Sequence, residues 1–380
     1  MSCQAFSRRM RLNATSARLL PMVQVPLHCR GSVARHCRSS AARWRTCFLH
    51  ACLAYAGLIG FSSHAQTPPL SAEGQPTTTL HVNTSVVLVP TLVEKHSGEV
   101  LYGLTAKDFR VEDNGVPQEV RVEDDLDSQP VSVVVAIERG RTSLLQFQKF
   151  SRIGPLLELF MGGGHGDAAV VTFDSAPELL QDFTPDTDAV TGKLQHLEPG
   201  DGGAAILDAV AYSVDLLDNQ PKDRRRVLLL ISESRDHGSH LVNEQGLVQR
   251  IGETNTLVLS VTYSASKSEF LNDLKGGGTV GPTMNLLSPL MMAVAAMHKN
   301  VARQLAVMSG GEYAPYTRER GLEESIAATA RHARNRYLLS FRPGDRTPGL
   351  HQLRVRLTQD YGADVVARSS YWADADPQSR

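Results

Sequence analysis

The feature that most constrains the fold is a regular alternation of strand-like and helix-like segments between Pro130 and Arg334. The strand-like segments are short and rich in Val, Ile and Leu, a composition typical of strands buried on both faces of a parallel sheet. Four strands are expected, at Val131–Ile137, Ala168–Phe173, Arg226–Ile231 and Thr256–Thr262. Five helices are expected, at Leu144–Phe160, Ala204–Leu217, Val242–Ile251, Pro289–Met308 and Leu322–Arg334. For residues 130–334, this pattern predicts an α/β fold with a doubly wound, mostly parallel sheet and helices on both faces.

Segments rich in β-forming residues flank this pattern on both sides. Residues 80–128 contain short apolar runs, at Leu80–Val82, Val86–Val89, Phe109–Val111 and Val120–Val122. The last two runs enclose Asn114-Gly115, a strong signal for a β-hairpin turn. Residues 335–373 contain three further strand-like runs, at Tyr337–Phe341, His351–Leu357 and Val365–Tyr371. Because about 50 residues are few for an independent domain, we expect the N-terminal β-rich segment to pack on the rest of the chain.

Three stretches are expected to lack regular structure. Residues 66–79 are rich in Pro, Thr and Ser, which indicates a disordered linker. Ser264–Asn285, which contains LKGGGTVGPT, interrupts the α/β pattern as a flexible surface insertion. Residues 374–380 form a short polar tail.

The first 65 residues differ in composition from the rest of the chain. They contain nine Arg, no Lys, Asp or Glu, and all five Cys. Arg43 and Arg45 precede an apolar run at Cys47–Phe61, and Ser63-His64-Ala65 resembles a signal cleavage site. The run is shorter than the ~20 residues of a membrane span. We therefore expect residues 1–65 to be an N-terminal extension and signal peptide, and the mature protein to be exported, periplasmic or extracellular, beginning near Gln66.

The chain after the expected signal is acidic, with 30 basic and 40 acidic residues in 66–380. This balance argues against nucleic acid or an anionic membrane surface as the main partner, and no membrane insertion is expected beyond the signal segment. No Cys remains, so a disulfide, a thiolate nucleophile and a zinc–cysteine cluster are excluded. The local charge cluster Asp223-Arg224-Arg225-Arg226 is expected to be a solvated edge.

Polar residues follow the first core strand directly, as Glu138-Arg139-Gly140-Arg141-Thr142. The carboxyl ends of strands are where open α/β sheets place their ligand sites. Together with DGGAAILDAV (Asp201–Val210) and VLLLISESRDHGS (Val227–Ser239), this segment resembles the von Willebrand factor type A (VWFA) family. The flanks, including VLVPTLVEKHSGEVLYGLTAKDFRVEDNG and RNRYLLSFRPGD, are similar to the exported bacterial branch called the VWFA-related (acidobacterial) domain. The resemblance covers roughly Thr79 to Ala373.

The resemblance implies a divalent-cation site, from which this sequence departs. In the family, an Asp-x-Ser-x-Ser loop, a Thr and a second Asp hold the cation. The corresponding positions here are Glu138, Gly140, Thr142, Ala204 and Glu233. Gly140 and Ala204 have no side-chain oxygen and both glutamates are one methylene longer, whereas magnesium tolerates little departure from octahedral geometry. We therefore expect a degenerate metal-ion-dependent adhesion site (MIDAS) that binds no metal, with Arg139 and Arg141 in a position to pair with Glu138 and Glu233.

The remaining motifs form no catalytic constellation. MGGGHGD (Met161–Asp167) and LKGGGTVGPT lack the Gly-Lys-Ser/Thr of a phosphate-binding loop. Asp236, His237 and His240 could form a small metal cluster, although exposed histidines without a fourth ligand are usually bystanders. Asp208 is expected to cap or orient its helix. No cofactor and no catalytic residue are expected.

The leading hypothesis is a non-enzymatic interaction module that binds an unidentified protein partner. Its binding surface would be the β-rich flanks or the rim at the carboxyl edge of the sheet, which comprises Glu138–Thr142, Gly202–Ala205 and Ser232–His240. Three alternatives remain open: a metal-dependent adhesion module, a structural accessory of a cell-envelope complex, and an enzyme with an unrecognised site. The sequence indicates neither the identity of the partner nor the oligomeric state.

Overall fold

The computed structural model describes residues 86–123, 129–140, 150, 152–162, 166–263, 288–316 and 319–374. The chain divides into two units, 1–77 and 78–380, and all the described residues lie in the second. The expected signal peptide, the linker, the Leu80–Val82 strand and the insertion at Ser264–Asn285 lie outside the described residues. The expectations for these segments stay predictions.

The centre of the second unit is a six-stranded sheet with the order β10-β9-β8-β5-β6-β7. Its strands are β5 (Val131–Glu138), β6 (Gly166–Phe173), β7 (Pro177–Thr184), β8 (Arg225–Ser232), β9 (Leu257–Tyr263) and β10 (Tyr313–Tyr316). Neighbouring strands are parallel, except that β6 and β7 form an antiparallel hairpin at one edge. The predicted doubly wound, mostly parallel sheet is confirmed. The edge strands β7 and β10 add to the four strands that the sequence predicted.

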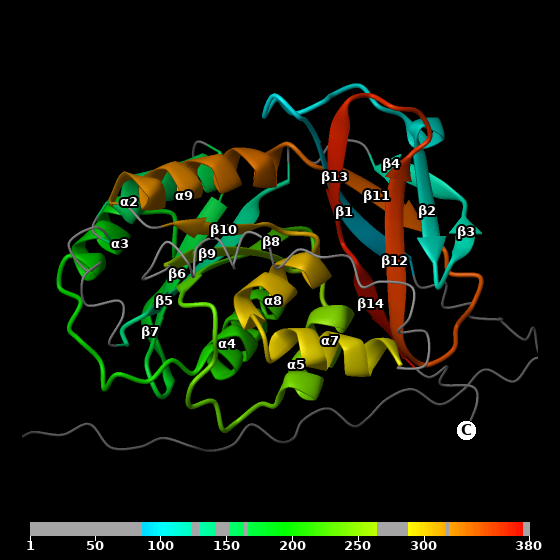
Figure 1. The fold of residues 1–380 in the computed structure, drawn as a ribbon. Coiled ribbons are helices and arrows are strands. Elements are labelled where there is room, and N and C mark those ends of the chain that lie inside the picture. Colours follow the sequence, from blue (N-terminus) through cyan, green and yellow to red (C-terminus); the bar gives the residue numbers. More distant parts are fainter. Residues whose placement is uncertain are drawn as a thin grey trace, which may run out of the picture. The chain divides into compact units, whose positions relative to one another are not determined.

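Helices cover both faces of this sheet (Figure 1). One face packs against α2 (Ile153–Met161), α3 (Thr187–Leu194) and α9 (Glu319–Arg334). The other packs against α4 (Ile206–Asp218), α5 (Glu244–Glu253), α7 (Pro289–Met297) and α8 (Val301–Ser309). Every residue of β5 is buried, and because successive side chains of a strand point to opposite faces, Val133 and Val135 join one core and Val134 the other.

Three helices differ from the sequence prediction. The helix expected at Leu144–Phe160 begins, as α2, only at Ile153 after a turn at Arg152, and residues 141–149 and 151 lie outside the described residues. The single helix expected at Pro289–Met308 is divided into α7 and α8 around Asn300. The side chain of Asn300 accepts a hydrogen bond from the Arg303 N–H and so caps the start of α8. Such a cap satisfies a backbone donor that would otherwise have no partner at the helix start. Helix α3, which was not predicted, is capped in the same way by Asp186.

The two β-rich flanks form two antiparallel four-stranded sheets, and each sheet contains strands from both flanks. One has the order β13-β1-β11-β4 and the other β14-β12-β2-β3. The strands from the N-terminal flank are β1 (Val87–Lys95), β2 (Phe109–Asp113), β3 (Val116–Gln118) and β4 (Val120–Glu123), and a 3-10 turn at Ala106–Asp108 precedes β2. Those from the C-terminal flank are β11 (Tyr337–Phe341), β12 (Gly349–Leu357), β13 (Ala363–Ala367) and β14 (Ser370–Ala373). A third hydrophobic core, which includes Val89, Phe109 and Leu339, is formed by residues of both flanks.

The turn at Asn114-Gly115 has positive φ angles of 48° and 84°, as the Asn-Gly hairpin signal requires. It joins β2 to β3, however, and not to the expected run Val120–Val122. That run lies in β4, which pairs with β11 in the other sheet. The Asn-Gly signal predicted the position of the turn correctly. The second strand of the hairpin is β3, whereas the sequence analysis expected Val120–Val122.

A buried arginine connects the flanking sheets to the α/β core. The guanidinium of Arg368 donates hydrogen bonds to the carbonyl oxygen of Gly252 at 2.7 Å and to the side chain of Asn255 at 3.0 Å. Gly252 lies in the last turn of α5, and Asn255 lies just after this helix. Burial lowers the pKa of Arg368 to about 10, so the side chain still carries its charge at neutral pH.

Candidate functional site

The candidate site lies at the carboxyl edge of the six-stranded sheet, where three loops meet. Glu138 is the last residue of β5, Ala204 precedes α4, and Glu233 follows β8. Ala204 and His237 form an isolated β-bridge, with reciprocal backbone hydrogen bonds of 2.9 and 2.8 Å. The Glu233 N–H donates to Glu138 Oε2 at 2.7 Å. The structure therefore brings four of the five positions implied by the family resemblance to one edge, and Thr142 lies outside the described residues.

Glu138 is almost completely buried, with 2% of its surface exposed. Burial raises the pKa of its carboxyl to about 7; the hydrogen bond from the Glu233 backbone opposes this shift and the nearby Glu233 charge adds to it. A carboxylate with few solvating partners favours its neutral form. This carboxyl therefore changes its charge near neutral pH.

Arg139 does not make the ion pairs that the sequence suggested. Its guanidinium lies 3.3 Å from the carboxylate of Asp174 and 3.3 Å from that of Glu178, both in the β6–β7 hairpin. Glu233 forms an ion pair of 2.5 Å with His237. The arginine side chain is thus directed to the edge hairpin, because consecutive residues at a strand end point in opposite directions. Arg141 lies outside the described residues.

The loop after β5 packs tightly against the loop before α4. A Cβ atom added to Gly140 would lie 2.5 Å from the carbonyl oxygen of Gly203 and 2.7 Å from Glu138 Oε1. Real Cβ atoms essentially never approach heavy atoms this closely. Any residue larger than glycine at this position would therefore displace the backbone of the neighbouring loop. Ala204, beside it, is 1% exposed.

Two further carboxylates, those of Asp208 and Asp236, hold the rim loops, each in a role that the sequence did not indicate. Asp208 accepts hydrogen bonds from three consecutive backbone N–H groups, those of residues 240–242, at 2.8–3.2 Å. It therefore orients the loop after β8 and does not cap its own helix. Asp236 supplies that cap, because its Oδ1 accepts from the Leu207 N–H at 3.0 Å and from the Ser239 hydroxyl at 2.6 Å. Sequence reasoning missed this cap because Asp236 is far from α4 along the chain.

The histidines of the rim are exposed and lie beside carboxylates. The side chain of His237 is 56% exposed and pairs with Glu233, and that of His240 is 65% exposed, with Nδ1 lying 3.7 Å from Asp208 Oδ2. Leu241, the next residue in the chain, is 68% exposed. An imidazole and a large apolar side chain are thus available to a binding partner at this edge.

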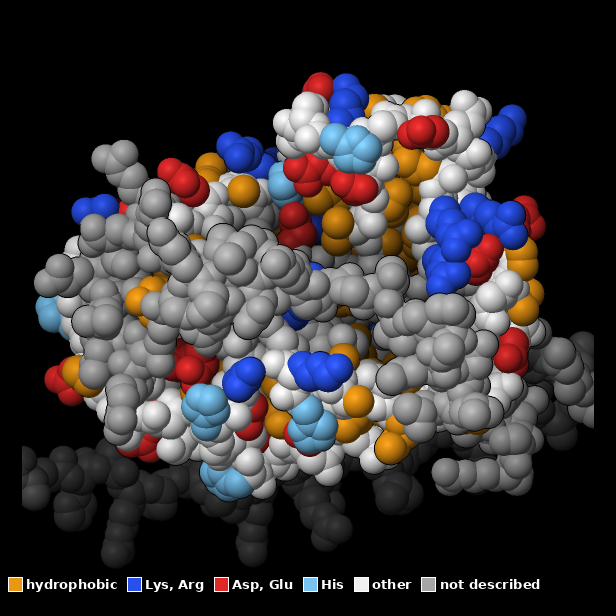
Figure 2. Space-filling view, viewed as in Figure 1, with side chains coloured by type: hydrophobic (Ala, Val, Ile, Leu, Met, Phe, Trp, Pro, Cys, Tyr) orange, Lys and Arg blue, Asp and Glu red, His pale blue; other side chains and the backbone are white. Residues whose placement is uncertain are grey.

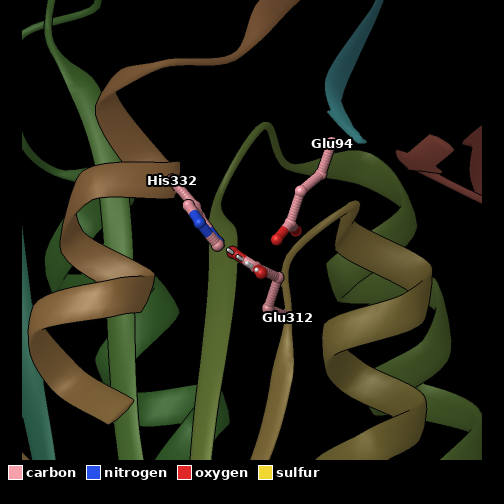
Figure 3. A group of neighbouring side chains, drawn as sticks. All are labelled: Glu94, Glu312 and His332. Atoms are coloured by element: carbon pink, nitrogen blue, oxygen red, sulfur yellow. Dashed lines mark hydrogen bonds and ion pairs between the residues drawn. The ribbon is translucent and has the colours of Figure 1, made fainter. Parts of the chain in front are cut away.

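A second polar cluster brings together Glu94 of β1, Glu312 just before β10, and His332 of α9 (Figure 3). Their oxygen and nitrogen ligand atoms all lie within 4.8 Å of one another. His332 Nδ1 lies 2.8 Å from Glu312 Oε1, and this hydrogen bond raises the pKa of His332. Sequence reasoning missed the cluster because Glu94 and Glu312 are far apart in the chain and no local motif marks them.

The described surface carries charges of both signs. Figure 2 shows acidic and basic side chains intermixed on the described part of this face, with hydrophobic side chains gathered over the flanking sheets. Arg226, placed in the sequence at a solvated edge, has a side chain only 9% exposed and pairs with Asp218. Among the described residues, the helices are all too short or too polar to span a bilayer.

Comparison with known proteins gives one family. Residues 138–235 match the family model of the von Willebrand factor type A domain. A search of the curated proteins gives no match.

Solved structures with similarity to the chain include the protein BatB from Bacteroides thetaiotaomicron, at 14% identity over 53% of this chain and 98% of that chain, with a TM-score of 0.35. The vWF domain of the pilus tip protein Mfa5 from Porphyromonas gingivalis is 20% identical over 28% of this chain and 39% of that chain, with a TM-score of 0.26. Proximal thread matrix protein 1 from the mussel byssus, with a zinc-occupied MIDAS motif, is 12% identical over 58% of this chain and 49% of that chain, with a TM-score of 0.38. The residues that match the family model run from the end of β5 to the loop after β8. Over residues 138–235, this chain is similar to the von Willebrand factor type A domain.

Proposed function

We propose that this protein is an exported, non-enzymatic VWFA module that binds a protein partner without a metal ion. The observation that carries the proposal is the close packing of Gly140 against Gly203. At the position where the family has a serine ligand, the carbonyl oxygen of Gly203 leaves no room for a Cβ atom. With Ala204 offering no oxygen either, the residues present do not fit a divalent cation of octahedral preference.

Contacts within the chain replace the bridging role that a cation would have. The Glu233 N–H bond to Glu138 ties β5 to β8, and the bridge between Ala204 and His237 ties the loop before α4 to the same segment. These hydrogen bonds connect all three loops. This arrangement supports a rim that keeps its shape when cations are removed.

The composition of the rim supports recognition of another protein. Leu241, His237 and His240 are well exposed beside it, and interfaces favour apolar and aromatic side chains over Lys and Glu. The expectation of export rests on the N-terminal sequence, and N-terminal sequencing of the mature species tests it: a start near Gln66 supports it, and a start well before Ser63 contradicts it.

The cation dependence can be tested by thermal unfolding of the full chain. We expect millimolar Mg²⁺, Mn²⁺ or Ca²⁺ to leave the melting temperature unchanged relative to EDTA. A cation present at a hundredfold excess over its Kd would stabilise the native state by about 2.7 kcal/mol, which is easily seen as a shift in melting temperature. A shift that disappears in Glu138→Ala would show that the site binds metal.

The binding surface can be tested by affinity capture from an extract of the native host. We expect the same partner in EDTA and in Mg²⁺, with binding lost in Leu241→Ser. Val116→Ser is the matched control, because Val116 is 58% exposed but lies on the flanking sheets. Loss of binding only in Val116→Ser would instead favour a structural accessory held by its flanks, and capture that requires Mg²⁺ would favour a metal-dependent adhesion module.

A further inference from the structure

We propose that Glu94, Glu312 and His332 form a binding site for a late first-row divalent cation such as Zn²⁺, which would connect β1 to α9. Two carboxylate oxygens and one imidazole nitrogen lie within 4.8 Å of one another, and Figure 3 shows the three side chains converging from three separate segments. Three protein ligands of these types with an open fourth position are typical of zinc sites. An imidazole nitrogen favours zinc over magnesium or calcium.

The spacing of the ligand atoms is close to what such a cation requires. Zinc–ligand distances of about 2.0–2.1 Å place tetrahedral ligand atoms about 3.3 Å apart. His332 Nδ1 and Glu312 Oε1 are 2.8 Å apart, and the Glu94 oxygen lies within 4.8 Å of both. Small side-chain movements, of about an ångström or less for His332 and Glu312 and somewhat more for Glu94, bring all three ligand atoms into coordination range.

A neighbouring arginine holds Glu312 in place. Arg336 Nη2 donates to Glu312 Oε2 at 2.9 Å, and its Nη1 donates to the Gly310 carbonyl at 2.6 Å. The arginine occupies the outer oxygen of Glu312 and leaves Oε1 directed at His332. Hydrogen bonds of this kind to the far side of a ligating carboxylate are a regular feature of metal sites.

Glu94 is the residue whose position the internal contacts do not explain. Its carboxylate points at Glu312 and His332 (Figure 3), yet within the described ranges it has no ion pair of its own. Of the two carboxylates, Glu312 is paired with Arg336, whereas Glu94 acts on His332 only through its charge. Two like charges at this separation repel, and a divalent cation between them would turn this repulsion into attraction.

The test compares the full-length wild type with single variants in a Zn²⁺ titration at pH 8, followed by thermal unfolding and by the absorption spectrum of Co²⁺ as a second probe. We expect Zn²⁺ to raise the melting temperature by several degrees and Co²⁺ to give a visible spectrum of low coordination number. Glu94→Gln keeps the shape of the side chain and should weaken the Zn²⁺ affinity by at least about tenfold. His332→Ala should reduce both signals to the level that the other histidines and the cysteines of the chain produce.

His237→Ala is the matched control, because His237 also lies beside a glutamate but outside the cluster. The chain contains 13 His and five Cys in all, so the differences between variants are the readout. Equal Zn²⁺ effects in wild type, Glu94→Gln and His237→Ala would overturn the proposal and leave the cluster as an ion-pair network. The result is independent of the proposed function, which concerns Mg²⁺ and Ca²⁺ at Glu138.

Discussion

Replacement of Glu138 by glutamine should make the protein more stable at alkaline pH and have a much smaller effect at acidic pH. The pKa of this carboxyl is raised from 4.5 to about 7, chiefly by burial. At pH 4 the side chain is fully protonated in the folded state and mostly protonated in the unfolded state. As the pH rises from 4.5 to 7, the unfolded state ionises first, so the wild type loses stability across this window and remains less stable above it.

The size of the shift sets the magnitude of the effect. One pKa unit corresponds to 1.36 kcal/mol, so the shift costs the wild type about 3 kcal/mol at pH 8 relative to pH 4. Glutamine carries no charge at either pH and its carbonyl oxygen can still accept the Glu233 N–H bond. Burial of the glutamine N–H groups costs the same free energy of unfolding at pH 4 and at pH 8. This cost therefore cancels when the stability of Glu138→Gln relative to the wild type is compared between the two pH values.

The assay is urea unfolding of both proteins at pH 4 and pH 8 in EDTA. The stability of Glu138→Gln relative to the wild type should rise by about 3 kcal/mol between the two pH values. Glu178→Gln is the control, because its side chain is 63% exposed, and it should show no comparable trend. A relative stability that is the same at pH 4 and pH 8 would refute the argument that burial controls this carboxyl.

Three further predictions concern the loops of the rim and can be checked by urea unfolding. Gly140→Ser should destabilise the protein by about 1–3 kcal/mol because its Cβ would overlap the Gly203 carbonyl; unchanged stability would show that the loop yields easily. Asp208→Asn should cost about 2 kcal/mol, since an amide N–H would face the backbone donors that the carboxylate now accepts; a neutral effect would contradict this. Asp236→Ala should cost about 1 kcal/mol through the lost cap of α4, and a larger loss would indicate a further role.

The sequence predicted the central sheet because its strands are buried on both faces and therefore consist of continuous apolar runs. The edge strands lack this signal. β7, with the sequence PELLQDFT, is only half-buried and carries charges, and β10 is four residues long with a proline inside it. Edge strands tolerate proline and polar residues, so a search for apolar runs passes over them. The pairing of the two flanks could not be predicted either, since it depends on contacts between distant segments.

For the site, the sequence identified which positions meet but not what each side chain contacts. The aligned motifs placed Glu138, Ala204 and Glu233 at one edge, where the structure also has them. The expected pairing of Arg139 with these glutamates was wrong because a residue adjacent in sequence at a strand end points to the other side. Nor could any local pattern show that Asp236 caps a helix that begins much earlier in the chain.

The position of β1 between β11 and β13 sets the order in which the chain can complete its fold. Thr91 of β1 pairs with Tyr337 on one side and Ala367 on the other, so the first strand of the described chain meets both its neighbours only when nearly all the rest has been made. At synthesis rates of about 5–20 residues per second, the segment from β1 to its partner strands takes roughly 15–50 s to synthesise. Both edges of β1 lack their partner strands during most of this time. During that interval an apolar strand is open to pairing with other chains. A chaperone that covers residues 87–95 would therefore raise the yield of folded protein, and chains shortened before β11 would leave this strand permanently exposed.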